Sequence, residues 1–562
     1  MKRTFTLIFV ILGMYSFLSA QTALDPEQFV NTQITEAGVY TVEPGQFYAF
    51  DGRIDLTFEV TIIGPDEGWI MNATTPPVIV GTPASDGKAR QFFEIKEGGA
   101  LTIKNVILSG TNNNGEIGSV FISNTGGSKL IVDNCGITDW ADYALRNLNK
   151  GGDSLSVTNC VFINGMRPRY SPWGGFPVRL DVATSNVAFE NNTVINSGRL
   201  LANSGPFHNA NILQVHNTYI SQAVAGEEQR ANEFITANNI FYNYHFLGRK
   251  NELHSNPNNG YDSHFTTWNY FADSKLALDS ISLYLGQNLF YRPQEVLDWF
   301  ETSSGDSIDL SLLWEHADVD SFILADNNYT IGTNYSEMDP EFTAPPENLG
   351  AIVNYINASH NDPTSTWVDW RITSPVSYGA DGAPALNWPP AFDMSYSNEY
   401  LQTAGTDGLP LGDLNWFADK KEEYLANKDA IIAALRDSMV NAVAVYDPLT
   451  MDQTPLITSE GTTSLEDVAI GQFYLAGNFP NPFNQKTRIE FGLDQQSKVT
   501  LSVYSLVGQL VFERSADDLA KGAHAIDFDA ADLSTGIYLY KINAIGRNGQ
   551  KYLASEKMII SR

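Results

Sequence analysis

A short alternating phrase, apolar-x-apolar-x-Asn, recurs through the first half of the chain. Each copy alternates with the two-residue period that is typical of a half-buried β-strand. A strand this short cannot bury its apolar face alone, so the repetition predicts that the copies stack and share one continuous core. The copies are Leu101–Asn105, Leu130–Asn134, Leu155–Asn159, Val187–Asn191, Leu213–Asn217 and, more loosely, Phe234–Asn238.

The spacing between successive copies predicts one coil of a parallel β-helix. It runs from 21 residues, between positions 217 and 238, to 32 residues, between positions 159 and 191. Equivalent residues in neighbouring coils would lie about 4.8 Å apart, so an asparagine at one corner could bond the asparagines above and below it. A leucine-rich repeat would need a longer leucine framework, and a propeller would need four strands in each repeat.

The repeat resembles the pectin-lyase-like right-handed parallel β-helix over roughly residues 35–410. The resemblance implies an all-β fold and leaves the function open, because one fold carries many activities. We expect four segments along the chain. They are a signal peptide (1–20), a right-handed parallel β-helix with a cap and loop insertions (21–415), an amphipathic helix and linker (416–471), and a small immunoglobulin-like β-sandwich (472–562).

The helix expected over residues 419–440 places Leu425, Ile432 and Leu435 near one face, together with Met439. This face should pack on the β-helix or cap its far end.

The last ninety or so residues contain six or seven short strand patterns, which predict a small β-sandwich. They resemble the C-terminal sorting domain of the type IX secretion system of Bacteroidota and their relatives. One departure is Gln485, where that family often has a proline. The resemblance implies export through the type IX machinery, with removal of the domain and surface attachment as further options; the alternative is a passive spacer. The matching stretches are Asn478–Asn484, Val503–Gln509 (running on through Val511), Ser534–Tyr538 and Lys557–Ile560.

The first twenty residues have the pattern of a secretory signal. Lys2 and Arg3 precede an apolar stretch, Phe5–Leu18, and Ala20 suits cleavage. The stretch is short for a membrane anchor, and no later segment is long and apolar enough to span a bilayer. We therefore expect a mature chain that is secreted or attached to the outer-membrane surface.

The chain is acidic, with 34 basic and 65 acidic residues and a net charge of −31. This balance argues against nucleic-acid binding, which needs clustered lysine and arginine. It fits a solvated acidic surface, or calcium binding by scattered carboxylates.

Two cysteines, Cys135 and Cys160, each directly follow a repeating asparagine. They should be neighbours in adjacent coils, at a distance that a disulfide accepts. A disulfide and a simple ladder of two small apolar residues both remain open. No histidine stands at a spacing that would complete a zinc site.

Most coils carry an insertion that begins at about the same offset behind the repeating asparagine. In a stacked solenoid, equal offset means the same side of the molecule, so the insertions should form one wall and the binding face. They contain the stretches Asp139–Arg146, Gly165–Gly175, Ser197–His208, Gln222–Arg230 and Tyr244–His254.

No established catalytic motif is present, but the wall combines arginines, histidines and aromatic residues. Arginine pairs with carboxylates in bidentate fashion, and aromatic faces stack on sugars, so an acidic polysaccharide suits this mixture. Many β-helix proteins that the chain resembles are polysaccharide lyases, often with calcium. The resemblance nominates Lys250 or Arg169 as base, His208 or Tyr170 as acid, Arg199 to neutralise a carboxylate, Arg167, Trp173, Trp140, Tyr143 and His254 to bind substrate, and Asp139, Asp142 and Asp181 to hold calcium.

Two alternatives remain at this point. One is a non-catalytic surface protein that binds glycan through the same wall, and the other is a purely structural protein. A glycoside hydrolase would need a pair of carboxylates at a fixed separation, and no such pair is evident.

Overall fold

The computed structural model describes most of the chain between residues 21 and 561, so the expected signal peptide lies outside the described residues. The described ranges are 21–85, 87–113, 118–147, 154–166, 174–180, 184, 186–199, 202–203, 209–223, 231–247, 282–303, 329–336, 338–361, 368–439, 474–479, 483–493, 495–505, 510–531, 533–547 and 551–561.

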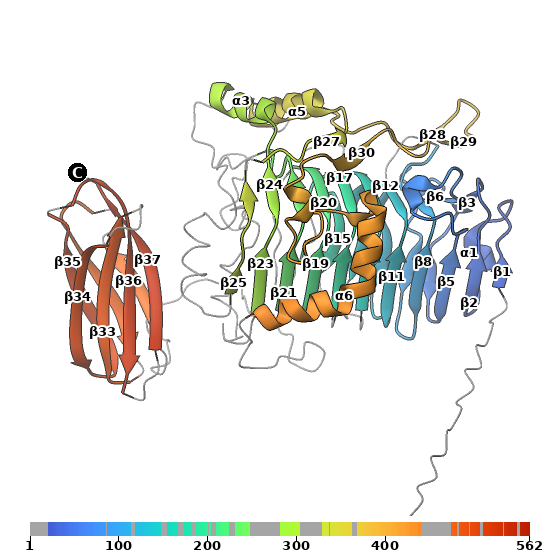
Figure 1. The fold of residues 1–562 in the computed structure, drawn as a ribbon. Coiled ribbons are helices and arrows are strands. Elements are labelled where there is room, and N and C mark those ends of the chain that lie inside the picture. Colours follow the sequence, from blue (N-terminus) through green and yellow to red (C-terminus); the bar gives the residue numbers. More distant parts are fainter. Residues whose placement is uncertain are drawn as a thin grey trace, which may run out of the picture.

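Two long parallel sheets wind around a common axis and form the larger part of the molecule (Figure 1). From β2 onward, consecutive strands of the first sheet are separated in the sequence by strands of the second, as a β-helix requires. The first sheet contains β1 (Gln21–Ala23), β2 (Gly38–Thr41), β5 (Glu59–Ile63), β8 (Ala100–Lys104), β11 (Lys129–Asp133), β13 (Ser154–Thr158), β16 (Asn186–Glu190), β19 (Asn209–Val215), β21 (Ala231–Ala237), β23 (Ser282–Gly286) and β25 (Tyr329–Ile331).

The second sheet has two strips, which meet in the long strand β12 (Gly136–Asn147). One strip contains β3 (Phe47–Phe50), β6 (Val78–Gly81), β9 (Ile107–Ser109), β14 (Val161–Gly165), β17 (Thr193–Ser197), β20 (Thr218–Gln222), β22 (Ile240–Tyr242), β24 (Leu289–Tyr291) and β26 (Tyr335–Ser336). The other contains β4 (Ile54–Leu56), β7 (Phe93–Ile95), β10 (Gly118–Asn124), β15 (Phe176–Leu180) and β18 (Ala202–Asn203).

The C-terminal module is built from two antiparallel sheets. The expected fold class, a parallel β-helix followed by a small β domain, is thus confirmed. One sheet contains β31 (Tyr474–Phe479), β32 (Lys486–Leu493) and β35 (Gly522–Asp529), and the other contains β33 (Ser497–Ser505), β34 (Leu510–Leu519), β36 (Gly536–Gly546) and β37 (Lys551–Ile560).

Helices, 3-10 turns and two short strand pairs lie outside the two long sheets. The helix α1 (Val30–Gln33) lies between β1 and β2, and its Val30 is buried in the main core. The helices α3 and α5 pack against each other around one apolar cluster. The elements are α3 (Gln294–Ser303), α5 (Leu349–Asn361), α6 (Ala418–Ser438), the 3-10 turns η1 (Ile70–Asn72), η4 (Leu401–Thr403) and η5 (Leu414–Trp416), and the strand pairs β27 (Phe342–Ala344) with β30 (Asp393–Tyr396) and β28 (Val376–Tyr378) with β29 (Pro384–Leu386).

The strand register confirms most of the repeating phrase but corrects its fifth copy. Val187 of β16 pairs with Ile212 of β19, so His216, not Asn217, occupies the corner equivalent to Asn191. The phrase Leu213–Asn217 was one residue out of phase. The physical reason is that α6 covers the outer face of β19, and the outward residues there are therefore apolar.

The continuous asparagine ladder lies one residue beyond the predicted corner and inside the β-helix. Each side-chain amide in this ladder donates to the side-chain oxygen of the next coil. At the predicted corner the described bonds include a single such rung, from Asn134 to Asn105 at 2.9 Å. The inner ladder runs through Asn192, Asn217, Asn239, Asn288 and Asn334, with donor–acceptor distances of 3.0, 3.0, 2.9 and 3.0 Å.

The two cysteines occupy the rungs just before this ladder. Both are free and fully buried, and the backbone N–H of Cys160 donates to Asn192 at 2.9 Å. Of the two alternatives for the cysteines, the structure shows a ladder of two small apolar residues and not a disulfide. Burial raises the pKa of the Cys160 thiol well above its usual value, with the neighbouring Cys135 adding to the effect.

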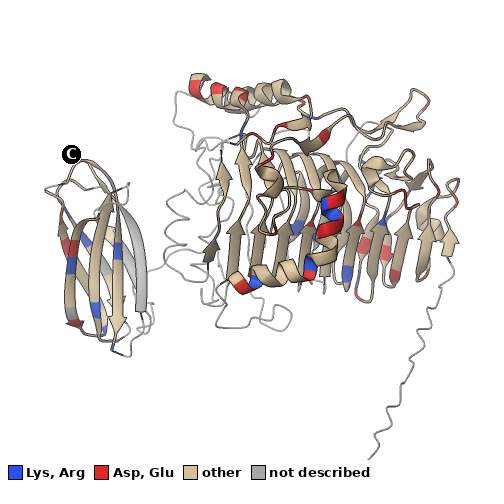
Figure 2. Ribbon diagram, in the orientation of Figure 1, with Lys and Arg blue, Asp and Glu red and all other residues tan. Residues whose placement is uncertain are grey.

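The helix α6 lies on the outer face of the first sheet and closes an apolar cluster there (Figure 1). Its inward face uses Tyr424, Ile432 and Leu435, while Leu425, which we expected on that face, is 55% exposed. That part of the prediction was wrong, because Tyr424 occupies the inward position. Lysine and acidic residues occur along α6 (Figure 2), and one of them, Lys428, pairs with the buried Glu190 of β16 at 2.7 Å. In the described part of the chain, no helix has the length and apolar character needed to span a membrane.

Candidate functional site

Three arginines and two aromatic rings come together where the long strand β12 pairs with β15. The register places Tyr143 beside Phe176 and Arg146 beside Arg179. The guanidinium carbons of Arg146 and Arg179 lie 4.8 and 4.9 Å from the centroid of the Tyr143 ring, and Arg179 lies 5.7 Å from that of Phe176. Arg199 approaches the Phe176 ring at 5.4 Å. We call these five residues the arginine–aromatic cluster.

Strand pairing explains how distant sequence positions reach this cluster. Arg146 and Arg179 are neighbours in adjacent coils, so their backbones are separated by about 4.8 Å along the helix axis. Arg199 leaves the end of β17 at Gly198, whose N–H donates to the carbonyl of Gly165 in the preceding coil at 2.7 Å.

The backbone is closely packed at this corner. A Cβ at Gly198 would lie 2.3 Å from the carbonyl oxygen of Gly174, and one at Gly175 would lie 2.1 Å from that of Gly165. Gly175 also has a φ of +77°, a conformation that other residues rarely adopt. Glycine at these positions lets the chain pass close beside the cluster.

The cluster concentrates positive charge on a chain that is otherwise acidic. Arg199 is 5% exposed, and Arg146 and Arg179 are partly exposed. A guanidinium over an aromatic ring gains roughly 0.5–2 kcal/mol, which holds the side chain in place. Its N–H donors lie in a rigid plane that matches a carboxylate in bidentate fashion. The arrangement can therefore bind carboxylates, and the partly exposed ring of Tyr143 can present an edge to a sugar, whereas Phe176 is buried and supports the cluster from within.

Tyr143 and Arg199 are the nominated residues that the structure brings into this cluster. Another nominated residue, Trp140, lies on the same strand but is fully buried. Its Nε1 donates to the carbonyl oxygen of Phe176 at 2.8 Å, and its ring packs edge-to-face on Phe162. Trp140 thus supports the cluster from within the core and offers no surface to a ligand.

The nominated calcium ligand Asp139 is also inside the protein. It adopts a φ of +58°, and its carboxylate accepts from Ser374 Oγ at 2.7 Å and from Asn164 Nδ2 at 3.2 Å. Burial raises the pKa of Asp139, with these hydrogen bonds acting in the opposite direction. Its role in the structure is to fasten the segment around Ser374 to the corner of β12. Asp142 is partly exposed on the same strand.

In the ranges that the structure describes, no group of three or more His, Cys, Asp or Glu side chains could hold a metal ion. The other nominated residues lie outside the described residues. They are Arg167, Arg169, Tyr170, Trp173, Asp181, His208, Lys250 and His254.

Three members of the cluster were missed by reasoning on the sequence. Arg146 was noted only as the last residue of an insertion, and Arg179 and Phe176 were not nominated. The sequence did contain a signal that Arg146 and Arg179 point outward from strands. Each directly follows an inward-facing apolar residue, Leu145 or Val178. Finding the pair required the register between β12 and β15.

Comparison with known proteins identifies the C-terminal module. Residues 478–561 match the family described as the secretion system C-terminal sorting domain. A search of curated proteins finds no match. The sorting domain indicates that the chain is exported by the type IX secretion system and is either secreted or held at the cell surface. It also implies that the secretion machinery is a partner of this domain.

Proposed function

We propose that this exported protein binds an acidic polysaccharide at the arginine–aromatic cluster. The observation that carries the proposal is the in-register stacking of Arg146 and Arg179 against the rings of Tyr143 and Phe176. A uronate sugar presents a carboxylate and an apolar ring face together, and the partly exposed arginines and the Tyr143 ring offer a partner for each.

A polymer suits the cluster better than a small acid. The arginines repeat along the helix axis at the coil spacing of about 4.8 Å, and a polyuronate repeats its carboxylate along the chain. Successive carboxylates can then bind successive arginines, so that weak individual contacts add through their linkage.

Cleavage of the bound polysaccharide by β-elimination is the second candidate. The observation that favours it is the buried position of Arg199 beside Phe176, since a lyase must neutralise a substrate carboxylate before the adjacent proton leaves. The base nominated from the resemblance is Lys250 or Arg169, and the acid is His208 or Tyr170. The described residues offer no calcium site, and Asp139 does not fit that role, so no step is assigned to calcium.

Affinity electrophoresis of the full chain tests the binding proposal. Migration is measured in gels that contain a polyuronate or an uncharged polysaccharide. We expect retardation by the polyuronate only, with a loss of at least tenfold in affinity for the Arg146→Ala, Arg179→Ala double variant.

A control variant must distinguish the loss of net positive charge from the loss of this particular site. Lys104 pairs with Asp133 at 3.1 Å on the first sheet, and Lys129 pairs with Glu59 at 2.6 Å. The Lys104→Ala, Lys129→Ala double variant removes the same positive charge elsewhere and should migrate as the wild type does. Equal retardation of both double variants would contradict the assignment. Ultraviolet absorbance of unsaturated uronate, with and without added calcium, then decides whether elimination follows binding.

A further inference from the structure

A column of corner residues runs along the edge of the first sheet, at the positions that follow β16, β19, β21 and β23. Each has a positive φ, which asparagine tolerates better than most residues. In two coils the asparagine is replaced by a longer side chain, His216 or Gln287. The column consists of Asn191 (φ +51°), His216 (φ +52°), Asn238 (φ +61°) and Gln287 (φ +52°).

The first three corner residues hold the segment 405–415 against the β-helix by bonding its main chain. Asn191 Oδ1 accepts from the N–H of Leu414 at 3.3 Å, and Asn238 Oδ1 accepts from that of Thr406 at 2.9 Å. His216 Nδ1 lies 3.3 Å from the carbonyl oxygen of Gly412.

Hydrogen bonding between a corner asparagine and the main chain of another segment also occurs at an earlier corner. Asn134 accepts from the N–H of Ile70 at 2.7 Å and donates to the carbonyl of Gly68, also at 2.7 Å. In several coils, therefore, the side-chain amide at this corner binds a main-chain amide group of another segment.

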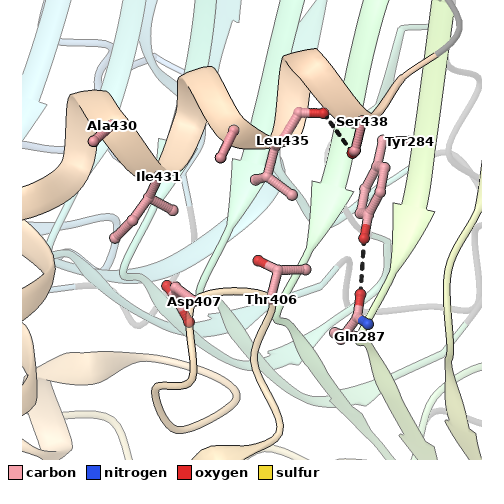
Figure 3. A pocket seen from close by; sticks show the side chains of 9 residues that line it. Tyr284, Gln287, Thr406, Asp407, Ala430, Ile431, Leu435 and Ser438 are labelled. Carbon is pink, nitrogen blue, oxygen red and sulfur yellow. Dashed lines mark hydrogen bonds between the residues drawn. The ribbon is translucent and has the colours of Figure 1, made fainter.

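At Gln287 the column continues, but among the described contacts its side chain bonds Tyr284 and not the segment 405–415. Gln287 instead lines a cavity of about 460 Å³ between α6 and the first sheet (Figure 3). Its Oε1 accepts from the hydroxyl of Tyr284 at 2.8 Å, which fixes the orientation of its amide group. The amide-binding corner of this coil thus faces an open space of the size that small ligands occupy.

The cavity has one polar wall and one apolar wall. Thr406 and Asp407 lie on the side of the covering segment, and the side chains of Ala430, Ile431 and Leu435 line the helix side (Figure 3). Ala434 and Ser438 complete the rim.

Asp407 is the one charged residue among the described residues that line this cavity. Its side chain is only 1% exposed, and its carboxylate already accepts from His216 Nε2 at 2.9 Å and from the N–H of Leu409 at 3.0 Å, so its charge is not available to a ligand. A neutral ligand therefore suits the cavity better than an ion.

We propose that this cavity binds a neutral sugar that carries a secondary amide, an N-acetylhexosamine. The acetamido group pairs with the amide of Gln287, as main-chain amides pair with the other corners. Its methyl group packs on the apolar wall, and the sugar hydroxyls bond the hydroxyl groups of Thr406 and Ser438. A peptide presents one N–H and one carbonyl per residue, whereas a sugar ring presents several hydroxyls, so the hydroxyl groups of Tyr284, Thr406 and Ser438 in the lining favour the sugar. The site is separate from the arginine–aromatic cluster and does not depend on the function proposed there.

Binding is measured by saturation-transfer NMR and titration on the full chain. The probes are N-acetylglucosamine, glucose and the methylamide of N-acetylalanine, which supplies the amide without a sugar. We expect N-acetylglucosamine to bind and each of the other two to bind at least tenfold more weakly.

Two variants and a control locate the binding site. Gln287→Asn keeps a residue that tolerates the corner conformation but withdraws its amide by one methylene, and should weaken binding about tenfold. Ala434→Leu should fill the cavity and abolish binding. Ala433→Leu adds the same bulk at an exposed position of α6 outside the lining and should leave binding unchanged.

Several results would overturn the proposal. They are equal binding of glucose, tighter binding of the peptide amide, no binding of N-acetylglucosamine by the wild type, or unchanged binding by both Gln287→Asn and Ala434→Leu.

Discussion

Replacing Asn217 by alanine probes the ladder that holds the β-helix coils together. Asn217 is fully buried, and its Oδ1 accepts from both the backbone N–H and the side chain of Asn192 at 3.0 Å. Its Nδ2 donates to Phe189 at 2.8 Å, Val215 at 3.1 Å and Asn239 at 3.0 Å. One substitution therefore removes an entire rung.

The expected loss follows from the groups left behind. The N–H of Asn192 loses the acceptor that the ladder supplies, whereas the Asn192 side chain retains Val157 at 3.0 Å. Asn239 Oδ1 retains the backbone N–H of residue 217 at 2.9 Å. One orphaned buried donor costs about 1–3 kcal/mol, and the lost side-chain bonds add to it, so we expect a loss of about 2–4 kcal/mol.

Urea unfolding followed by tryptophan fluorescence measures this loss in the full chain. All ten tryptophans lie between Trp69 and Trp416, so the signal reports on the β-helix and not on the C-terminal module. The matched control is Asn211→Ala, which removes an exposed 3.0 Å bond to Asn186 and should cost less than about 0.5 kcal/mol. Equal losses in the two variants would refute the claim that the inner ladder stabilises the stack.

Three further predictions concern other buried groups. Cys135 and Cys160 should react with a thiol reagent only after unfolding, and two free thiols should then be counted without reductant; fewer than two would contradict the ladder assignment. Burial raises the pKa of Asp413 to about 7, so its contribution to stability is complete below about pH 4 and is lost as the pH rises through 7. The change in unfolding free energy between pH 5 and pH 8 should therefore shrink in Asp413→Asn, and an unchanged pH dependence would refute this. Tyr424→Phe removes a buried 3.0 Å bond to Glu190 and should cost about 1.5–3 kcal/mol by urea unfolding, whereas a loss below 0.5 kcal/mol would show that the bond contributes little.

The repeating phrase was sufficient to predict the coils because their inward residues are apolar in most copies. It failed at β19, where the inward position is Gln214 and the apolar residues Leu213 and Val215 face α6. Periodicity records which residues are buried but not which element buries them. A covering helix that comes two hundred residues later can thus shift the apparent phase of a strand.

The same limit applies to the site. Sequence offset predicted that insertions leave the β-helix near one corner, and three of the strands that precede them end in register, at Gly165, Ser197 and Gln222. The wall of insertions itself stays a prediction. Sequence offset could not pair Arg146 with Arg179, because that contact depends on the register of β12 with β15. It also could not separate Trp140, which faces the core, from Tyr143 on the same strand.

The arginine–aromatic cluster is proposed to recognise carboxylates on a sugar chain. The most direct test compares one polyuronate before and after chemical reduction of its carboxyl groups to alcohols, using titration calorimetry on the full chain. The sugar rings and their linkage are the same in both ligands, so the difference reports on the carboxylates. We predict measurable binding of the native polymer and at least a tenfold loss on reduction. Equal binding of the two polymers, or no binding of the native one, would contradict the account.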